Sequence, residues 1–361
     1  GGSASMTLTI TITDPSGRDF NGDGFDDVYF THGTTTTNQG GRLFFGSASS
    51  TSRTVNASAA DVVVTGGTRM GQGAWVGDIN NDGYADLVTG DAVGQSGTST
   101  VYIFFGSATP ASSRTPSNAD VVIAGSGGNF GQTIEPAGDV NGDGIDDFLV
   151  GAAYTDPAGP DSGSAYLFHG RSSWPSTFSY TNANVTFSGT NSYDQFGAYA
   201  AGAGDVNNDG YDDVLIGASL DDDGSFDGGC GHLFFGGASM PSNLTTSNAN
   251  LTITGTSANG YLAVVAGIGD VNNDGYDDIA VGAWNASRVA IVFGGASLSG
   301  TINDTAADIL ITGSGLFGNS VAGGMDHNGD GIDDFWISAP QANSSGQAYL
   351  FLGATSLGNT S

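Results

Sequence analysis

Short apolar runs recur along the whole chain, and the positions between them are mostly Gly, Ser, Thr, Asn or Asp. Some runs alternate apolar and polar residues with period two, as in Asp120-Val-Val-Ile-Ala124 and Asn250-Leu-Thr-Ile-Thr254. Others, such as Phe148-Leu-Val150, are continuous and rich in aromatic or β-branched residues. The first pattern predicts half-buried strands and the second fully buried ones, so we expect an all-β chain.

The strands follow one another in a fixed order that repeats. A small-residue strand that often opens with Phe-Gly is followed by an acidic segment and a buried strand. An aromatic strand closing on Gly and an alternating strand come next. Four short strands per repeat, six times over, predict a β-propeller with four-stranded antiparallel blades.

The acidic segment has the pattern D-x-N-x-D-G-x-x-D, and its copies occupy 19–27, 78–86, 139–147, 205–213, 270–278 and 326–334. The start-to-start intervals are 59, 61, 66, 65 and 56 residues. Positions 1, 3, 5 and 9 supply side-chain oxygens, position 7 a backbone carbonyl, and position 6 is the Gly of a sharp turn. Oxygen ligands at this spacing predict one calcium ion per loop, or about six in all.

The expected calcium ligands are Asp19, Asn21, Asp23, Phe25 and Asp27; Asp78, Asn80, Asp82, Tyr84 and Asp86; Asp139, Asn141, Asp143, Ile145 and Asp147; Asp205, Asn207, Asp209, Tyr211 and Asp213; Asp270, Asn272, Asp274, Tyr276 and Asp278; and Asp326, Asn328, Asp330, Ile332 and Asp334. Position 8 is Asp in five copies and Ala85 in the second, so it is not assigned as a ligand.

An EF-hand begins in the same way but requires a Glu at position 12 and a helix on each side. Position 12 is apolar in five copies and Thr89 in the second, and these residues belong to predicted strands such as Val214-Leu-Ile216. The loop is therefore expected between two strands. Because its carboxylates repel one another without a cation, folding should depend on calcium.

The charge balance excludes some classes of partner. The 37 acidic residues face 7 basic ones, giving a formal net charge of −30, and most of the acidic residues lie in the six loops. A nucleic acid or an anionic membrane surface has no basic footprint to bind. The single Cys, Cys230, excludes an intrachain disulfide, and no apolar stretch is long enough to span a bilayer.

The order Phe-Gly, then Gly-Asp-x-Asn-x-Asp-Gly-x-x-Asp, then Gly-Ala or Ser338-Ala339-Pro340, resembles the FG-GAP repeat of the integrin α-subunit N-terminal propeller and its bacterial relatives. This resemblance implies that each calcium loop joins the first and second strands of a blade on the lower face. It also implies that ligands meet the upper face, and that the protein is an extracellular or cell-surface one.

Integrin propellers have seven blades, but every repeat here carries a loop and the intervals leave no space for another, so six blades are favoured over seven. Residues 6–361 are expected to form one propeller domain, and residues 1–5 to be a cloning remnant without a signal peptide. The segment Thr7-Leu-Thr-Ile-Thr-Ile-Thr13 either replaces the missing first strand or closes the ring against the last repeat.

The loops of the upper face differ between repeats, which is typical of binding surfaces on a rigid scaffold. The longest run from Tyr154 to Ser164 and from Ser219 to Gly231. An Asp-rich loop with an aromatic residue suits a further cation, a sugar or a basic partner, and equally suits ordinary solvated surface. The candidate ligand-face residues are Tyr154, Tyr193, Asp221, Asp222, Asp223, Phe226, Asp227 and Trp284.

These features favour a calcium-stabilised binding or adhesion module for a protein or glycan ligand, monomeric as a domain. One alternative is a calcium-rigidified spacer in a larger surface protein, and another is a polysaccharide-active lyase or hydrolase. Such enzymes need a positioned acid, base or cation, and the chain offers only four His, seven Arg and one Glu, Glu135. No catalytic residue is assigned.

Overall fold

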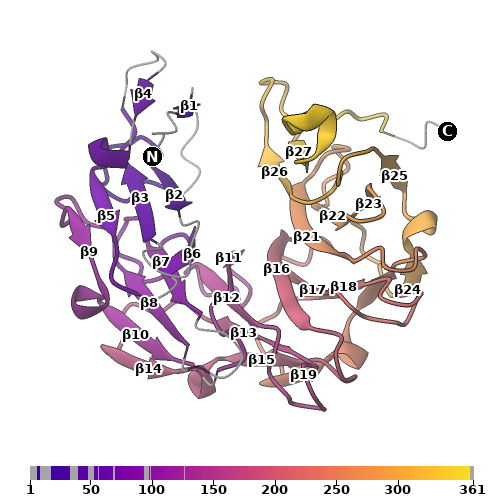
Figure 1. Cartoon of the computed structure of the whole chain (residues 1–361), viewed down its shortest axis with the longest axis horizontal. Coiled ribbons are helices and arrows are strands. Elements are labelled where there is room, and N and C mark those ends of the chain that lie inside the picture. Colours follow the sequence, from indigo (N-terminus) through magenta and orange to yellow (C-terminus); the bar gives the residue numbers. More distant parts are fainter. Residues whose placement is uncertain are drawn as a thin grey trace.

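The computed structural model describes residues 6–8, 18–32, 40–47, 53–55, 57–67, 70–92, 97, 99–125 and 127–357. Within these ranges six sheets stand side by side around a common centre, as the blades of a propeller do (Figure 1). The helical segments of the described residues are single 3₁₀ turns, and no α-helix occurs among them. The predicted all-β propeller with six blades is confirmed.

Each blade is a meander whose own strands pair antiparallel with their neighbours. From the inner to the outer edge, the blades contain β2 (Val28–His32), β3 (Gly40–Phe44) and β5 (Val62–Val64); β6 (Met70–Trp75), β7 (Leu87–Asp91), β8 (Thr100–Phe104) and β10 (Val121–Ala124); β11 (Thr133–Gly138), β12 (Asp147–Ala152), β13 (Ser164–Phe168) and β15 (Val185–Ser188); β16 (Phe196–Gly204), β17 (Asp213–Ala218), β18 (Cys230–Phe234) and β20 (Leu251–Thr254); β21 (Leu262–Gly269), β22 (Asp278–Ala283), β23 (Arg288–Val292) and β25 (Ile309–Thr312); and β26 (Val321–Met325), β27 (Asp334–Ala339) and β28 (Gln347–Phe351).

The core lies between the faces of adjacent blades. All six residues of β12, β17 and β22 are buried, because each of these second strands is covered by a neighbouring blade on both faces. Across one such interface the rings of Phe187 and Phe234 lie 4.8 Å apart. Fully burying a side chain of this size contributes roughly 1.5–3 kcal/mol, so most of the hydrophobic stabilisation comes from contacts between blades.

A fifth strand, which the sequence analysis did not predict, joins most blades to the next one. The link between the third and fourth strands of a blade contributes a short strand that pairs in parallel with the outermost strand of the preceding blade. The blades are therefore mixed sheets and not purely antiparallel ones. These linking strands are β9 (Ser113–Arg114), β14 (Thr177–Ser179), β19 (Asn243–Thr245) and β24 (Gly300–Asn303).

A 3₁₀ turn follows each linking strand. The turns are η2 (Pro116–Asn118), η3 (Tyr180–Asn182), η4 (Thr246–Asn248) and η5 (Asp304–Ala306). In the first three, the last residue is an Asn whose side chain accepts the backbone N–H three residues earlier. This local bond closes the turn and returns the chain to the outer edge of its own blade.

The first and last blades have fewer strands than the central ones, and Figure 1 shows a gap between them. Near the N-terminus, β1 (Met6–Leu8) pairs antiparallel with β4 (Arg53–Val55), which precedes the turn η1 (Ala57–Ala59). The predicted role of Thr7–Thr13 falls mostly outside the described residues, which resume at residue 18. The last blade contains a short turn, η6 (Ala342–Ser344), before β28.

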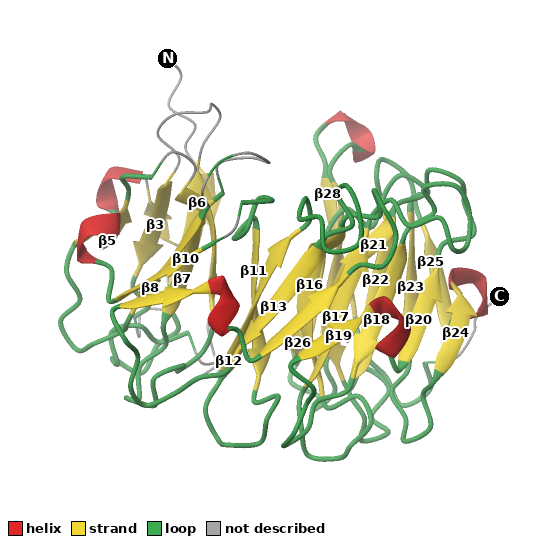
Figure 2. Ribbon diagram, turned by 90° about the horizontal axis from the view of Figure 1, so that it is seen from below, coloured by secondary structure: helices red, strands yellow, loops and turns green. Residues whose placement is uncertain are grey.

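Viewed from the side, the strands end in two sets of loops at opposite ends of the blades (Figure 2). The acidic loops join first strands to second strands, as between β11 and β12, so all of them lie at the same end. We call this the lower end, and the opposite one, with the connections from second to third and from fourth to first strands, the upper end. Within the described ranges, no helix is long and apolar enough to cross a membrane.

Candidate metal centres

The six acidic loops adopt nearly the same backbone conformation. The Gly at position 6 has a positive φ in every copy, between 85° and 91°, which disfavours any residue with a Cβ. A Cβ at these glycines would meet no atom within 4 Å, so the backbone conformation and not crowding requires Gly. The six glycines are Gly24, Gly83, Gly144, Gly210, Gly275 and Gly331.

The carboxylate at position 1 organises each loop. In the third loop, Asp139 accepts the backbone N–H of Asp143 through Oδ1 (2.9 Å) and that of Gly144 through Oδ2 (2.7 Å). Asp143 in turn accepts the N–H of Ile145. The same bonds occur in the other five loops, and they turn the side chains at positions 1 and 5 toward the inside of the turn.

The Asn at position 3 has a side chain whose hydrogen-bonding capacity is only partly used. Its amide nitrogen donates to the Asp at position 5 in most copies. In three copies its Oδ1 atom is buried and has no hydrogen-bond partner among the described residues, namely in Asn80, Asn207 and Asn272. A buried acceptor without a donor costs free energy, and a bound cation inside the loop would satisfy it.

The carboxylate at position 9 is buried and engaged by the backbone. In the third loop, Oδ2 of Asp147 accepts the N–H of Val140 and Oδ1 accepts that of Gly170, at the end of the third strand. The same pair of bonds recurs in the other blades. This residue therefore fastens the loop to its own blade, while its remaining lone pairs stay available to a cation.

Burial raises the pKa of the position-9 carboxyl groups in the first five loops, and the carboxylates at positions 1 and 5 raise it further. The pKa reaches about 8 in Asp86 and Asp147, and about 7 in Asp27, Asp213 and Asp278. The backbone donors act in the opposite direction. A divalent cation between the three carboxylates would remove the mutual repulsion and favour the ionised form.

The Asp at position 8 has a different role, which sequence reasoning missed. Oδ2 of Asp212 accepts the N–H of Asp139, the first residue of the preceding blade's loop, at 2.7 Å, and the Asp212 N–H donates to the Asp139 carbonyl. Gly138, at φ +72°, leaves room for this contact, because a Cβ there would lie 2.1 Å from Oδ2 of Asp212. Corresponding carboxylate bonds come from Asp146, Asp277 and Asp333. Position 8 joins adjacent blades.

The one departure at position 8 has a matching departure in the neighbouring blade. Ala85 stands at position 8 of the second loop, and only its backbone N–H bonds to the Asp19 carbonyl. Arg18 precedes Asp19, whereas Gly precedes position 1 in the four loops whose first N–H donates to a position-8 carboxylate. In the sequence, a Gly before position 1 of one loop thus occurs together with an Asp at position 8 of the next loop. This correlation could have revealed the bond between blades.

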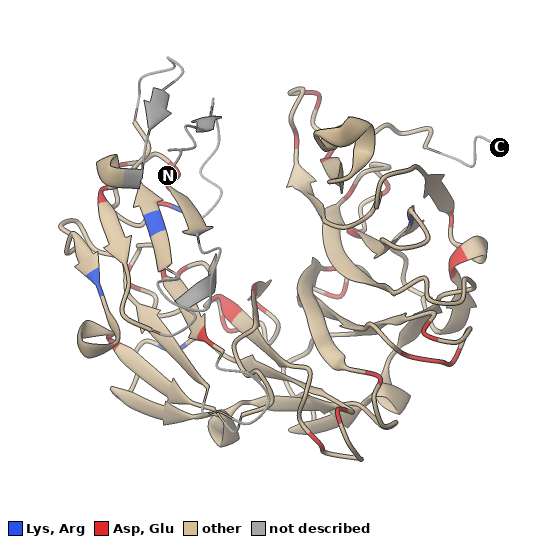
Figure 3. Cartoon of the chain, viewed as in Figure 1, with Lys and Arg blue, Asp and Glu red and all other residues tan. Residues whose placement is uncertain are grey.

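The lower end therefore presents six all-oxygen donor sets, and acidic residues mark the loops around the arc in Figure 3. Oxygen-only donors with three carboxylates suit a hard divalent cation of the calcium type, and exclude the N and S ligands that zinc prefers. The structure brings together the predicted side-chain ligands of each loop.

The predicted ligand-face residues lie at the upper end, but not all of them are exposed. Tyr193 and Phe226 are 60% and 65% exposed, while Tyr154 is half-buried. Trp284 is half-buried and stacks on Tyr261, with ring centroids 5.1 Å apart.

In the long loop after β17, Asp222 and Asp223 are exposed and Asp227 is half-buried. Asp221 differs from them: it is 2% exposed and points inward against β18. It therefore adds nothing to an exposed ligand face, which is a correction to the sequence prediction.

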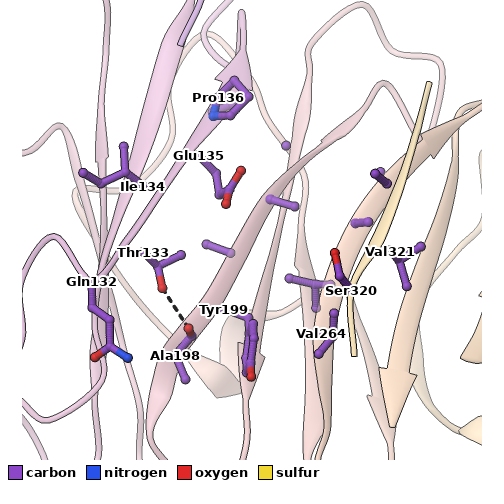
Figure 4. Close-up of a pocket in the computed structure, with 18 of the residues that line it drawn as sticks. Gln132, Thr133, Ile134, Glu135, Pro136, Ala198, Tyr199, Val264, Ser320 and Val321 are labelled. Atoms are coloured by element: carbon purple, nitrogen blue, oxygen red, sulfur yellow. Dashed lines mark hydrogen bonds between the residues drawn. The ribbon is translucent and has the colours of Figure 1, made fainter. Parts of the chain in front are cut away.

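A cavity of about 860 Å³ opens where the first strands β11, β16, β21 and β26 converge (Figure 4). Glu135 points into it, and desolvation raises the pKa of this carboxyl group to about 7. Tyr199, Thr133 and Ser320 also line the wall, and Thr133 donates to the Ala198 carbonyl (2.8 Å). The described lining residues include no His, Arg or Cys.

Comparisons with known proteins agree with this architecture. The family model of an FG-GAP-like repeat matches residues 19–89, and that of the FG-GAP repeat matches residues 130–168 and 317–351. The chain thus carries FG-GAP repeats, and its described residues form a six-bladed propeller.

Among curated proteins, the chain is similar to integrin alpha chains. It is 34% identical to mouse integrin alpha-IIb over 167 residues, covering 45% of this chain and 15% of that protein. It is 34% identical to Xenopus laevis integrin alpha-5 over 169 residues, 42% of this chain and 15% of that protein. With Caenorhabditis briggsae integrin alpha pat-2 the identity is 29% over 237 residues, 62% of this chain and 18% of that protein. The chain therefore spans less than a fifth of the length of these relatives.

Proposed function

We propose that the chain is a calcium-stabilised propeller that acts as a binding or adhesion module, with its ligand on the upper end of the blades. The relatives are integrin alpha chains, which supports an adhesion role at the outside of a cell, where calcium is abundant. Each of the six loops binds one calcium ion in this proposal. The ions stabilise the scaffold, and the variable loops opposite them carry recognition.

The observation that carries the calcium proposal is the buried Asn oxygen without a donor, repeated in three loops beside three carboxylates. A protein with a net charge of −30 cannot offer enough cationic side chains to neutralise these clusters. The expected ligands are the side chains at positions 1, 3, 5 and 9 and the carbonyl at position 7. With a water molecule they supply about six oxygens, which is within the range that calcium takes.

The position of the loops explains why calcium would stabilise the whole ring. The residue after each aromatic strand donates to the position-2 carbonyl of the preceding loop, as Gly237 does to Val140 (2.9 Å). An ion that orders one loop thus also orders the edge of the next blade. Ligand binding stabilises the folded state by about 2.7 kcal/mol per site at 100 times the dissociation constant.

Calorimetry with Ca²⁺ on the chelator-treated protein tests this part, and we expect about six ions per chain. An anomalous difference map from crystals grown in calcium gives an independent count. Fewer than four ions at millimolar calcium would contradict the assignment.

The upper end supports the binding part of the proposal, because exposed aromatic rings of Tyr193 and Phe226 stand there on loops fixed by backbone bonds. Asn259 donates to the Phe226 carbonyl (2.7 Å) and Tyr193 donates to that of Pro160 (2.7 Å). A preorganised aromatic side chain loses little conformational entropy on binding a protein or a sugar.

A glycan array and a panel of extracellular-matrix proteins, each probed in calcium and in EDTA, test this part. We expect a signal that calcium supports and that Tyr193→Ser with Phe226→Ser abolishes. Leu352→Ser, which removes a half-exposed apolar side chain elsewhere, is the matched control. If neither panel gives a signal, the alternative of a calcium-rigidified spacer in a larger surface protein is favoured. Turnover of polysaccharides that Glu135→Gln abolishes would favour an enzyme.

A further inference from the structure

A second kind of polar cluster lies beneath the long upper loop of the fourth blade. Asp221 comes from the loop between β17 and β18, and Cys230 and His232 are the first and third residues of β18. Sγ of Cys230 donates to Oδ1 of Asp221 at 3.1 Å, and Nε2 of His232 lies 3.9 Å from Oδ2 of Asp221. One ligand atom from each residue lies within 4.8 Å of the other two.

All three side chains are buried, and the imidazole is incompletely satisfied. Asp221 and His232 are each 2% exposed and Cys230 is 0% exposed. Nδ1 of His232 is 3.2 Å from the hydroxyl of Thr252, whereas Nε2 has no hydrogen-bond partner among the described residues. A buried ring nitrogen that faces a carboxylate and a thiol without a bond of its own indicates a missing ligand.

Comparison of the blades shows that this cluster is special to the fourth. Cys230 pairs with the last residue of β17, as Ser164 pairs with the last residue of β12. His232 occupies the register position of Tyr166. In the second blade the same two positions hold Thr100 and Tyr102. Of the second, third and fourth blades, only the fourth places a thiol and an imidazole together beneath an inward-pointing carboxylate.

The Asp221 carboxylate is buried beside a thiol and an imidazole. Burial acts to raise the pKa of Asp221, but His232, the N–H of Asp223 and the Cys230 thiol together hold it below its ordinary value. Among the described residues no Arg bonds to Asp221, whose carboxylate accepts from the Asp223 N–H and the Cys230 thiol and faces His232. Burial and the charge of Asp221 raise the pKa of the Cys230 thiol far above its ordinary range, so that the thiol is neutral until a cation displaces its proton.

We propose that Asp221, Cys230 and His232 form a transition-metal site of the zinc type. A divalent ion would be held by Oδ of Asp221, by the Cys230 thiolate, and by Nε2 of His232, with the thiol proton released to solvent. Two negative ligands and one neutral ligand balance the charge of the ion.

The dimensions of the cluster suit this ion. Ligands about 2.0–2.3 Å from a tetrahedral zinc ion lie roughly 3.3–3.7 Å from one another. In the structure Sγ of Cys230 lies 3.1 Å from Oδ1 of Asp221 and Nε2 of His232 lies 3.9 Å from Oδ2, with one ligand atom of each residue within 4.8 Å of the other two, so small side-chain adjustments reach that range. Nδ1–H of His232 would donate to Thr252 and fix the ring with Nε2 toward the metal, as second-shell partners commonly do. The fourth coordination position is open for water or a nearby carboxylate such as Asp194.

This site is independent of the calcium proposal, because calcium does not take sulfur or imidazole ligands and zinc favours them. The bound metal would fasten the long loop to β18. It would thereby set the position of Asp222 and Phe226 on the upper surface, close to the blade that follows.

The test is a titration of Zn²⁺ into the whole chain in calcium-containing buffer, followed by elemental analysis after gel filtration. We expect one tightly bound zinc ion per chain. With Co²⁺ in place of zinc, the absorption spectrum should show a thiolate-to-cobalt charge-transfer band, which the oxygen-only loops cannot produce. Wild-type protein without that band would overturn the proposal, whatever its variants do.

Variants assign the ligands. Cys230→Ser should weaken zinc binding at least about 100-fold, the upper end of what the loss of a supporting partner costs a metal site. Cys230→Ser combined with His232→Tyr recreates the pattern of Ser164 and Tyr166 in the third blade, so it should fold, keep its calcium and bind no zinc at this site. Asp227→Asn, which removes a carboxylate from the same loop outside the cluster, should bind zinc as the parent does. Equal zinc binding by the parent and the double variant would also overturn the proposal.

Discussion

The lower and upper ends of the blades are built on opposite principles. The six lower loops share one sequence pattern, one glycine conformation and one set of backbone bonds. The upper loops differ in length and composition, from Trp284-Asn-Ala-Ser287 to the excursion between β17 and β18. A loop that must fit the same neighbour in every blade has little freedom to vary, whereas a loop without that requirement can change in length and composition. The contrast predicts that stability resides mainly at the lower end.

Removal of calcium should have the largest effect. Excess EDTA should lower the melting temperature by tens of degrees, because every blade interface at the lower end loses its ions and keeps its repelling carboxylates. Differential scanning fluorimetry with and without added calcium measures this. A melting curve that ignores the chelator would contradict the structural role of the metal.

Loss of one site should cost much less. Asp209→Ala removes the position-5 carboxylate of the fourth loop, which bonds to Asn207 and Tyr211. We expect a fall of a few degrees in the melting temperature and one fewer calcium ion by calorimetry, since five loops remain. Asp222→Ala, at the upper end, is the matched control and should change neither quantity.

The bond between blades can be tested apart from the metal. Asp212→Ala should leave the calcium count unchanged and lower the free energy of unfolding by about 1–2 kcal/mol, through loss of the bond to the Asp139 N–H. Ala85→Asp in the second loop is the reverse experiment. Loss of a calcium ion in Asp212→Ala would show that position 8 acts as a ligand.

Glu135 lies between the two ends, on the wall of the central cavity. Its pKa in the folded protein is about 7, above the ordinary value of 4.5, so the folded state holds a proton that the unfolded state has lost. The stability due to this group should be present at low pH and fall as the pH rises from about 4.5 to about 7. Glu135→Gln should therefore flatten this part of the pH profile and be the more stable protein at pH 8. Identical profiles would contradict the raised pKa.

The smallest effect should come from the exposed upper surface. Asp222→Ser together with Phe226→Ser should change the free energy of unfolding by less than about 0.5 kcal/mol per site while weakening any ligand binding. Chemical denaturation measures the first quantity and the binding panel the second. A large loss of stability would show that this loop is part of the scaffold.

The sequence was sufficient where structure depends on residues close together in the chain. The loop pattern, the positive-φ glycines and the alternation in segments such as Val185–Ser188 are local properties, and they predicted the strands and the blade order correctly. The number of blades followed from counting one motif.

What could not be predicted depends on contacts between distant segments. The position-8 bond from Asp212 reaches a residue of the previous repeat, so only a comparison of successive repeats could have revealed it. The linking strands are only two to four residues long and occur in Ser/Thr-rich segments that resemble turns. Asp221 belonged to an acidic run that suited an exposed ligand face and ordinary solvated surface equally, and its inward contacts are with Cys230 and His232 from the next strand.

The parallel linking strands also bear on how such a chain can grow or shrink by duplication. Because β14 follows the third strand of one blade but completes the sheet before it, a genetic unit cut at the blade boundary would leave the earlier sheet without its outer partner. A unit cut after the link instead would separate the third strand from the fourth, as β13 from β15, so no unit of one repeat length carries every pairing. A duplicated repeat therefore depends on its neighbours wherever the chain is divided, because the link of one copy must pair with the outer strand of the copy before it.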